Sequence, residues 1–238
     1  MSPPWAFQTP PCCALKPPLD KSGVTADLKP VTRGTFISFE GGEGAGKSTQ
    51  IRRLAERLKA DGADVVLSRE PGGSLGAEQI RDLILNGDVD RWSPVTETLL
   101  MYASRRDHIE RVIRPALDRG AIVLCDRFAD STRAYQGAGG EAPIGLIKAL
   151  EEHVLGGTTP DLTLIFDIPA EVGLERALAR GGEARFESKG LAFHQRLGEA
   201  FLEIARREPE RCVVIEANDA IDAVWADVWT AVSTRLGL

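Results

Sequence analysis

Residues 41–48 read GGEGAGKS, and this stretch decides the fold. It has the spacing G-x-x-x-x-G-K-[ST] of a phosphate-binding loop, and it stands between an apolar strand pattern and a helical pattern, as such a loop requires. Glycines allow backbone N–H groups to turn inward around an anion, and the N-terminus of the following helix adds positive potential. A simple glycine turn between strand and helix is the alternative interpretation.

The motif predicts a role for each of its polar side chains. Lys47 is expected to reach the β- and γ-phosphates of ATP, and the Ser48 hydroxyl is expected to bind Mg²⁺. Nucleotide binding follows from the loop, but a reaction does not. A GTP-dependent switch also needs N-K-x-D and D-x-x-G motifs, and the sequence contains neither. The predicted ATP-binding residues are Gly41, Gly42, Glu43, Gly44, Ala45, Gly46, Lys47, Ser48 and Thr49.

Short apolar strands alternate with amphipathic helices from Thr35 onward. This alternation predicts one α/β domain over residues 34–238, with a parallel sheet covered by helices on both faces. Residues 181–189 interrupt the helical pattern. The predicted strands are 35–40, 63–68, 121–126, 161–167 and 212–217. The predicted helices are 50–62, 75–85, 94–117, 131–136, 143–155, 170–179 and 221–236.

Composition limits the classes of function. The chain has 238 residues and a net charge of −6, which argues against non-specific binding along nucleic acid. No apolar run reaches the ~18 residues of a membrane helix, and no secretory signal is evident, so we expect a cytoplasmic protein. The four cysteines form no C-x-x-C pair, which favours plain thiols in a reducing compartment. Residues 1–33 are rich in proline, and we expect a disordered extension there.

Charged residues follow two of the predicted strands, at the sheet edge where parallel α/β proteins bind ligands. Asp126 and Arg127 follow the third strand, and the sequence REPGG (69–73) follows the second. Asp126 is suited to hold Mg²⁺ through water, and Arg127 to clamp an acceptor phosphate with two hydrogen bonds. A surface ion pair and a tight turn are the plainer alternatives.

One face of the predicted helix 94–117 mixes apolar and charged residues. Glu97, Met101, Arg105 and Ile109 are spaced four apart and therefore share that face. A helix face that lines a pocket carries both types of residue. The alternative is a helix rim on which the stem of Arg105 covers apolar surface.

Three arginines surround the glycine pair 181–182: Arg176, Arg180 and Arg185. In phosphoryl transfer, an arginine on a closing segment stabilises the charge on the transferred group. A solvated basic helix end is the alternative interpretation.

Taken in order, these motifs resemble bacterial thymidylate kinases. The resemblance rests on FEGGEGAGKST (39–49), REPGG (69–73), TLLMYASRRDH (98–108), DRFADSTRAYQG (126–137) and the late arginine-bearing segment. It implies transfer of the γ-phosphoryl group of ATP to thymidine monophosphate (dTMP), giving the diphosphate for dTTP synthesis. It also implies Mg²⁺, a homodimer, and a three-layer α/β/α P-loop NTPase fold. The implied sheet has five parallel strands in the order 2-3-1-4-5, with a short lid at about 180–189.

The resemblance also implies roles for individual residues. Arg127 and Arg81 match basic residues on the acceptor side, Arg105 matches the arginine that hydrogen-bonds the thymine carbonyl, and Tyr135 and Gln136 match residues that close on base and sugar. The implied substrate-binding residues are Glu43, Arg69, Glu70, Pro71, Arg81, Met101, Arg105, Arg127, Ser131, Tyr135 and Gln136. The implied catalytic residues are Lys47, Arg127, Arg176, Arg180 and Arg185, and the implied metal ligands are Ser48 and Asp126.

Two positions depart from the family pattern. Met101 stands where a phenylalanine usually stacks on thymine, and Leu178 occupies a lid position that often carries arginine. Met is flexible and polarisable enough to cover a base.

The expected reaction is a direct transfer between two bound nucleotides. The acceptor phosphate is itself the nucleophile, so no general base is needed, and His108, His153 and His194 are expected to be helix-surface or packing residues. The alternatives are a kinase of the same fold acting on another nucleoside monophosphate or a deoxynucleoside, and a nucleotide-gated binding protein.

Overall fold

A five-stranded parallel sheet forms the middle layer of the structure, a computed structural model that describes residues 33–88, 90–179 and 189–237. The strand order is β2-β3-β1-β4-β5, which confirms the predicted order. The three central strands are almost fully buried, whereas the two edge strands are partly exposed. The strands are β1 (Phe36–Gly41), β2 (Val65–Arg69), β3 (Ile122–Asp126), β4 (Leu162–Asp167) and β5 (Cys212–Glu216).

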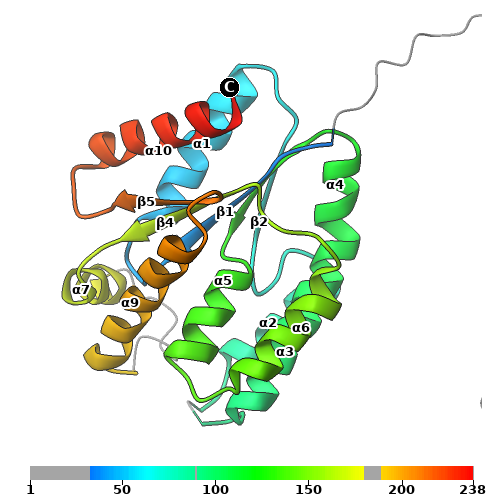
Figure 1. The fold of residues 1–238 in the computed structure, drawn as a ribbon, viewed down its shortest axis with the longest axis vertical. Helices are drawn as coiled ribbons and strands as arrows, with labels where there is room; N and C mark the ends of the chain where they lie inside the picture. The colour runs from blue at the N-terminus through cyan, green and yellow to red at the C-terminus, as the bar shows by residue number, and fades with distance from the viewer. Residues whose placement is uncertain (1–32, 89, 180–188, 238) are drawn as a thin grey trace, which may run out of the picture. The chain divides into compact units, whose positions relative to one another are not determined.

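Helices cover both faces of this sheet, as the alternation of patterns predicts (Figure 1). The helices before the third strand are α1 (Lys47–Ala60), α2 (Leu75–Leu85), α3 (Pro94–His108), the π-helical turn η1 (Ile109–Ile113) and α4 (Arg114–Asp118). The later helices are α5 (Ala129–Thr132), the π-helical turn η2 (Arg133–Ala138), α6 (Ile144–Leu155), α7 (Ala170–Ala179), α9 (Leu191–Arg207) and α10 (Ile221–Leu236).

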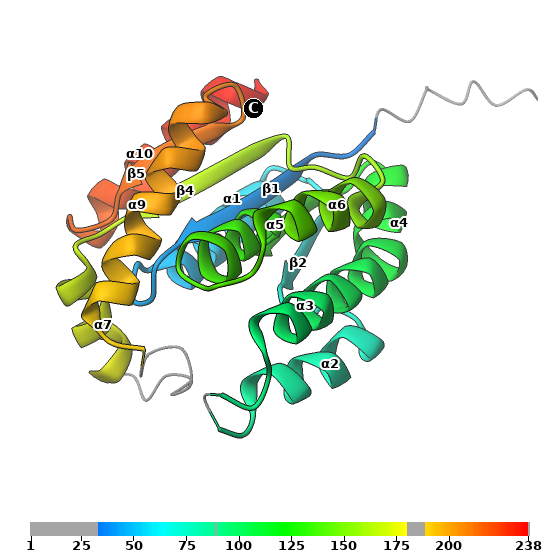
Figure 2. The same cartoon turned by 60° about the horizontal axis from the view of Figure 1, so that its bottom comes forward.

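One face of the sheet packs against α1 and α10, which lie side by side in Figure 1. Leu54 and Leu58 of α1 and Val228 and Val232 of α10 bury their side chains there with apolar residues of β1 and β4. The opposite face is covered by η1, α4, α5, α6 and α9, through residues such as Ile113 and Phe201. Figure 2 shows this other face, with α5 and α9 in front of the strands. The two helical layers bury the central strands, so the ligand-accessible part of the sheet is the edge at which the strands end.

Local sequence explains where several helices begin. The Ser74 hydroxyl accepts a hydrogen bond from the N–H of Ala77 and caps α2, and Ser93 caps α3 in the same way through Thr96. Pro94 occupies the first position of α3, where its missing N–H costs no hydrogen bond. The capping residues thus account for the two helix starts nearest the REPGG segment.

The predicted helix 94–117 is continuous but not regular. A π-helical turn at Ile109–Ile113 separates α3 from α4. Pro115 in the first turn of α4 has no N–H with which to continue the ladder of i to i−4 hydrogen bonds, and the wider turn precedes it. Pro115 is therefore the residue in the sequence that accounts for this departure.

Two predicted segments fall outside the described residues: the proline-rich extension 1–33, apart from Arg33, and nearly all of the lid at 180–189. The helix that follows the lid, α9, spans Leu191–Arg207. Among the described residues, every helix is too short or too polar to cross a bilayer.

Candidate active site

The glycine-rich segment forms a tight loop between β1 and α1. Gly46 caps α1 with a left-handed backbone (φ 82°), and Lys47 is buried with its Nζ donating to the carbonyl oxygens of Gly41 (3.1 Å) and Gly42 (2.7 Å). Gly44 also has a positive φ (69°), and a Cβ there would lie 2.0 Å from the carbonyl oxygen of Gly173 in α7. Only glycine therefore fits at Gly44, because both its backbone conformation and its neighbour exclude a side chain.

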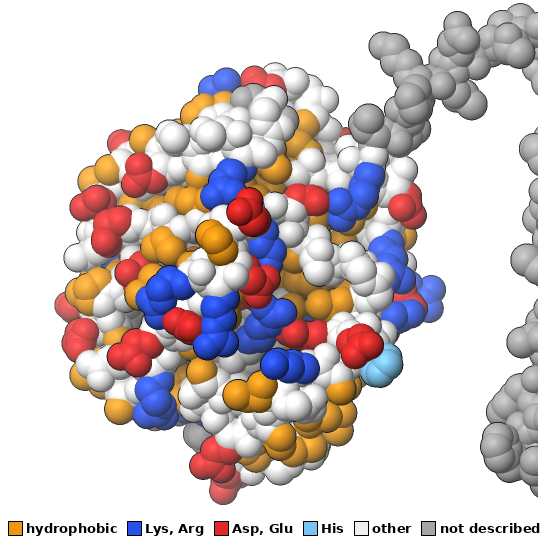
Figure 3. All heavy atoms as spheres, viewed as in Figure 1, with side chains coloured by type: hydrophobic (Ala, Val, Ile, Leu, Met, Phe, Trp, Pro, Cys, Tyr) orange, Lys and Arg blue, Asp and Glu red, His pale blue; other side chains and the backbone are white. Residues whose placement is uncertain are grey.

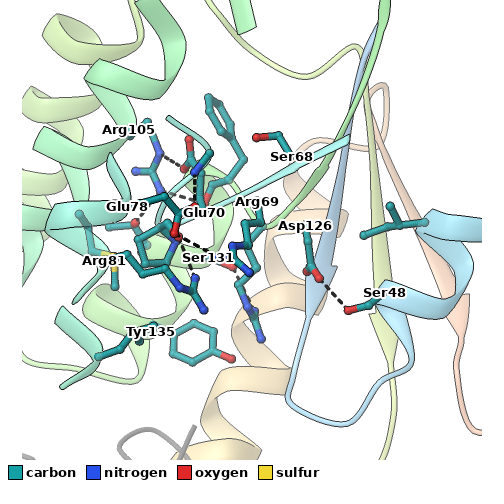
Figure 4. A pocket seen from close by; sticks show the side chains of 18 of the residues that line it. Ser48, Ser68, Arg69, Glu70, Glu78, Arg81, Arg105, Asp126, Ser131 and Tyr135 are labelled. Carbon is teal, nitrogen blue, oxygen red and sulfur yellow. Dashed lines mark hydrogen bonds and ion pairs between the residues drawn. The ribbon is translucent and has the colours of Figure 1, made fainter. Parts of the chain in front are cut away.

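A cavity of about 700 Å³ opens beside this loop, where β2 and β3 end (Figure 4). The parallel register aligns Arg69 of β2 and Phe39 of β1 with Asp126 of β3, so the segments after these strands meet at one edge. Every residue of the predicted substrate-binding set lines this one cavity: Glu43, Arg69, Glu70, Pro71, Arg81, Met101, Arg105, Arg127, Ser131, Tyr135 and Gln136. The two predicted metal ligands, Ser48 and Asp126, line it as well.

Arg127 is held at the point where the loop and the cavity meet. Its backbone is left-handed (φ 70°), a conformation that is rare outside glycine. Its Nη1 donates to Gly41 O (2.8 Å) and to Ser131 Oγ (3.2 Å), and its Nη2 donates to Glu43 Oε1 (2.9 Å). The same Glu43 oxygen accepts a hydrogen bond from the Tyr135 hydroxyl at 2.6 Å. Arg127 is thus fixed by the phosphate loop on one side and by α5 on the other.

Arg105 lies at the opposite end of the cavity and is almost fully buried (Figure 4). Its Nε donates to Glu70 Oε2 (2.7 Å), and its Nη2 donates to Phe128 O and Thr132 Oγ1 (both 3.1 Å). Its Nη1 is buried and has no hydrogen-bond partner among the described residues. A buried donor without a partner is costly, so this nitrogen is suited to a ligand acceptor such as a base carbonyl. The rim position considered for Arg105 is excluded by its burial.

Comparison with known proteins agrees with this geometry. The sequence model of the thymidylate kinase family matches residues 39–228. The chain is 76% identical over 208 residues to the thymidylate kinase of Caulobacter vibrioides, covering 87% of this chain and 100% of that relative. It is 55% identical over 207 residues to the thymidylate kinase of Bradyrhizobium diazoefficiens, covering 86% and 91%.

The chain belongs to the thymidylate kinase family.

A solved structure gives the same result at the level of the fold. The crystal structure of the Ehrlichia chaffeensis thymidylate kinase matches with a TM-score of 0.69 and 35% identity, covering 84% of this chain and 99% of that one. The resemblance inferred from the motifs is thereby confirmed, and so is the P-loop fold with its 2-3-1-4-5 sheet.

In this member of the thymidylate kinase family, the predicted metal ligands contact each other. Ser48 Oγ donates to Asp126 Oδ2 at 3.0 Å, and Asp126 Oδ1 is buried without a hydrogen-bond partner among the described residues (Figure 4). A hydroxyl beside a carboxylate with an unused oxygen is the hard oxygen donor set that Mg²⁺ prefers. The residues present therefore fit a magnesium site.

The charges of the site shift the ionisation of its residues. Burial alone raises the pKa of Glu43, but the charges of Arg127 and Lys47 hold that pKa at about 2, so Glu43 stays ionised. Burial, together with the charge of Arg127, lowers the pKa of Lys47 to about 8. Burial, together with the charge of Asp130, raises the pKa of Glu40 to about 7. A bound anion would therefore favour the charged form of Lys47, which burial and Arg127 disfavour.

Some predicted residues lie away from the cavity. Ile109 is buried in the apolar cluster under β3, and Glu97 accepts a hydrogen bond from Gln136 Nε2 (2.9 Å) behind the cavity wall. Arg176 donates to Ala217 O (3.3 Å) and Asn218 Oδ1 (3.4 Å) in the segment after β5. Arg180 and Arg185 lie outside the described residues.

His108 has a part in the site that the sequence did not indicate. It is fully buried, with Nδ1 at 2.9 Å from Glu70 Oε1 and Nε2 at 2.5 Å from Ser68 Oγ. The expectation of a packing residue is therefore incomplete, because His108 orients the carboxylate that holds Arg105. The spacing of Arg105 and His108 in α3 was a signal that they share one side of the helix, but nothing in the sequence paired them with Glu70.

Proposed function

We propose that this chain transfers the γ-phosphoryl group of ATP to dTMP, giving thymidine diphosphate for dTTP synthesis. The observation that carries the proposal is the convergence on one cavity of the phosphate loop, Arg127 and Arg105. Membership of the thymidylate kinase family supports the identity of the acceptor.

The two nucleotides are proposed to meet across Glu43 and Arg127. The loop amides and Lys47 hold the phosphates of ATP, and Arg127 clamps the phosphate of dTMP. The unpartnered Nη1 of Arg105 donates to a thymine carbonyl at the far end of the cavity. Holding both phosphates in line supplies proximity, and the cations around them stabilise the charge of the transferring group. The acceptor phosphate attacks directly, because it is anionic at neutral pH.

Proteins of this family use ATP, generally with a divalent metal ion, and we propose Mg²⁺ for this chain. Ser48 and Asp126 would hold it, and their contact at 3.0 Å supports this assignment. When bound, the ion would supply charge neutralisation for the phosphoryl group that is transferred.

The catalytic arginine is proposed to come from the lid. The candidates are Arg176, Arg180 and Arg185. Arg176 is the one described candidate; it lies on α7, whose Gly173 touches the phosphate loop.

Assembly and location complete the proposal. A homodimer is supported by α3, which exposes the apolar side chains of Val95 and Leu99. A cytoplasmic location is supported by the free, buried thiols of Cys125 and Cys212.

The test is coupled-assay turnover of ATP with dTMP, UMP, CMP and GMP as acceptors. The proposal predicts that kcat/KM for dTMP exceeds that for the others by at least ~10-fold. The control variant Lys47→Ala should lower kcat by roughly 10²–10³-fold while the fold survives. A different best acceptor would identify another nucleotide kinase. If no acceptor accelerates ATP consumption, the chain is a binding protein instead.

A further inference from the structure

Glu40 is a buried carboxylate to which none of the roles above applies. It is the β1 residue directly before the phosphate loop, it is fully buried, and it does not line the cavity. Both of its oxygens accept hydrogen bonds, Oε1 from the Phe128 N–H at 2.7 Å and Oε2 from Ser131 Oγ at 2.5 Å. Because burying a carboxylate is unfavourable, the two specific partners call for an explanation.

Both partners lie in the turn that carries Arg127. The N–H of Arg127 donates to Phe39 O at 2.9 Å, and the next N–H, that of Phe128, donates to Glu40. Two successive peptide groups are therefore anchored to β1, on either side of the Arg127 side chain. A non-glycine residue keeps a left-handed backbone only where its surroundings hold it. Glu40 is one of the two groups of β1 that hold Arg127 in this conformation.

Ser131 passes the same constraint to the guanidinium group. A serine hydroxyl has a single proton to donate, and Ser131 donates it to Glu40. The oxygen of Ser131 is then free to accept from Arg127 Nη1, which lies at 3.2 Å. Glu40 thus fixes the backbone of Arg127 directly and the direction of its side chain through Ser131.

We propose that Glu40 is a positioning residue for the acceptor phosphate, which holds the Arg127–Ser131 turn so that the Arg127 guanidinium faces the cavity. The inference rests on the proposed function, in which Arg127 clamps the phosphate of dTMP. It concerns the acceptor and not ATP, because the two partners of Glu40 both belong to the segment after β3.

The variant Glu40→Gln tests this with little change of shape. The amide oxygen can still accept from Phe128, but the amide nitrogen then faces Ser131 as a donor, so the serine loses its acceptor. At about pH 8, where most of the Glu40 carboxyl is ionised, we expect KM for dTMP to rise ~10-fold. KM for ATP should stay within ~2-fold of the unchanged protein.

Ser38→Ala is the matched control. Ser38 lies on the same strand, and its hydroxyl makes a buried hydrogen bond of 2.8 Å with Thr163. Among the described residues, it makes no hydrogen bond to the Arg127–Ser131 turn itself, and Thr163 is linked to that turn only through Arg211 and Asp130. Its removal should leave both KM values within ~2-fold. If Ser38→Ala raises KM for dTMP as much as Glu40→Gln does, the effect is a general loss of packing and the inference fails.

A double-mutant cycle that combines Glu40→Gln with Ser131→Ala tests whether Glu40 acts through Ser131. If Glu40 acts partly through Ser131, the two substitutions together should raise KM for dTMP by less than the product of their separate effects. If the effects of the two substitutions simply multiply, or if KM for dTMP is unchanged in Glu40→Gln, the inference is overturned. The proposed function is judged separately, by whether the wild-type protein phosphorylates dTMP. If Glu40→Gln does not fold, Glu40→Asp takes its place, because its shorter side chain withdraws the carboxylate from Phe128 and Ser131. An unchanged KM for dTMP in that variant overturns the inference as well.

Discussion

Lys47 is a buried ammonium group that contacts only backbone carbonyls in the part of the chain that the structure describes. Burial and the neighbouring Arg127 lower its pKa to about 8. The charged form, which attracts phosphate, is present below that pKa and is lost above it. In the free protein, kcat/KM for ATP should therefore fall as the pH rises through about 8. Bound phosphates favour the ammonium, so kcat at saturating ATP should fall only at higher pH.

The pH profile of kcat/KM for ATP in the variant Lys47→Arg is compared with that of the wild-type protein. Arginine keeps its charge throughout this range, so the variant should have a lower but level kcat/KM for ATP between about pH 7 and 9. If the unchanged protein gave a level profile as well, Lys47 would not be the group that titrates.

Asp126 is expected to hold the metal ion together with Ser48. Asp126→Asn keeps an oxygen beside Ser48 but removes the charge, so the Mg²⁺ concentration for half-maximal activity should rise ~10-fold or more. Asp167→Asn, at the end of β4 and outside the large cavity, is the control and should leave the Mg²⁺ dependence unchanged. An unchanged Mg²⁺ dependence in Asp126→Asn would remove Asp126 from the metal site.

How far the sequence predicts the site depends on how a residue acts. Arg127 was identifiable because it follows a strand, and Arg105 because it shares a helix face with Met101, whereas Tyr135 was indicated only by the family resemblance. Glu40 and His108 act through other residues, and their partners lie 38–91 residues away in the chain. No local pattern signals such a pairing, because burial next to a distant segment is a property of the folded chain.

The elements themselves were largely predictable. The bounds of α2, α7 and α10 agree with the sequence patterns, because amphipathic spacing and helix ends are local features. The strand order required the family resemblance, since apolar runs alone do not say which strands are neighbours. The π-helical turn before Pro115 was not predicted, because a proline disturbs a helix without specifying how the hydrogen bonds rearrange.

Helix α7 and the phosphate loop approach each other too closely for any side chain. A Cβ on Gly173 would lie 2.5 Å from the backbone carbonyl oxygen of Glu43. Neither atom could move away without a shift of the main chain of α7 or of the loop. Gly173→Ala should therefore displace the loop, raise KM for ATP by ~10-fold and lower the free energy of unfolding by about 1–3 kcal/mol. Urea unfolding and initial rates measure the two effects.

Gly145→Ala is the control for this substitution. Gly145 lies on α6, and a Cβ there meets nothing within 4 Å. Alanine should leave KM for ATP unchanged and the free energy of unfolding equal or slightly higher. A normal KM in Gly173→Ala would show that the loop tolerates movement of α7.

An ion-pair network ties the layers of the structure together beneath the segment that carries Arg127. Arg211, before β5, binds both oxygens of the buried Asp130 in α5 at 2.7 and 2.9 Å. Arg133 joins Asp130, Glu151 of α6 and Glu208 at the end of α9. The segment that carries Arg127 and Ser131 is therefore braced from α6, from the end of α9 and from the residue before β5, which suits the proposed phosphate clamp.

The surface carries both signs of charge. On the face shown in Figure 3, Lys and Arg side chains lie interspersed with Asp and Glu side chains. The net charge of the chain is −6. In this arrangement the positive groups that matter for an anionic ligand are those gathered in the cavity, such as Arg69, Arg81 and Arg127.

Direct phosphoryl transfer requires that ATP and dTMP bind side by side in one site. The sharpest test is the binding of a molecule in which adenosine is joined to thymidine through a polyphosphate chain. If the phosphate loop and the end of the cavity at Arg105 belong to one site, this molecule spans both. Titration calorimetry should then give a single binding event that both ATP and dTMP displace, with an affinity above that of either nucleotide alone. Displacement by only one of the two nucleotides, or separate binding of two bridging molecules per chain, would contradict the account.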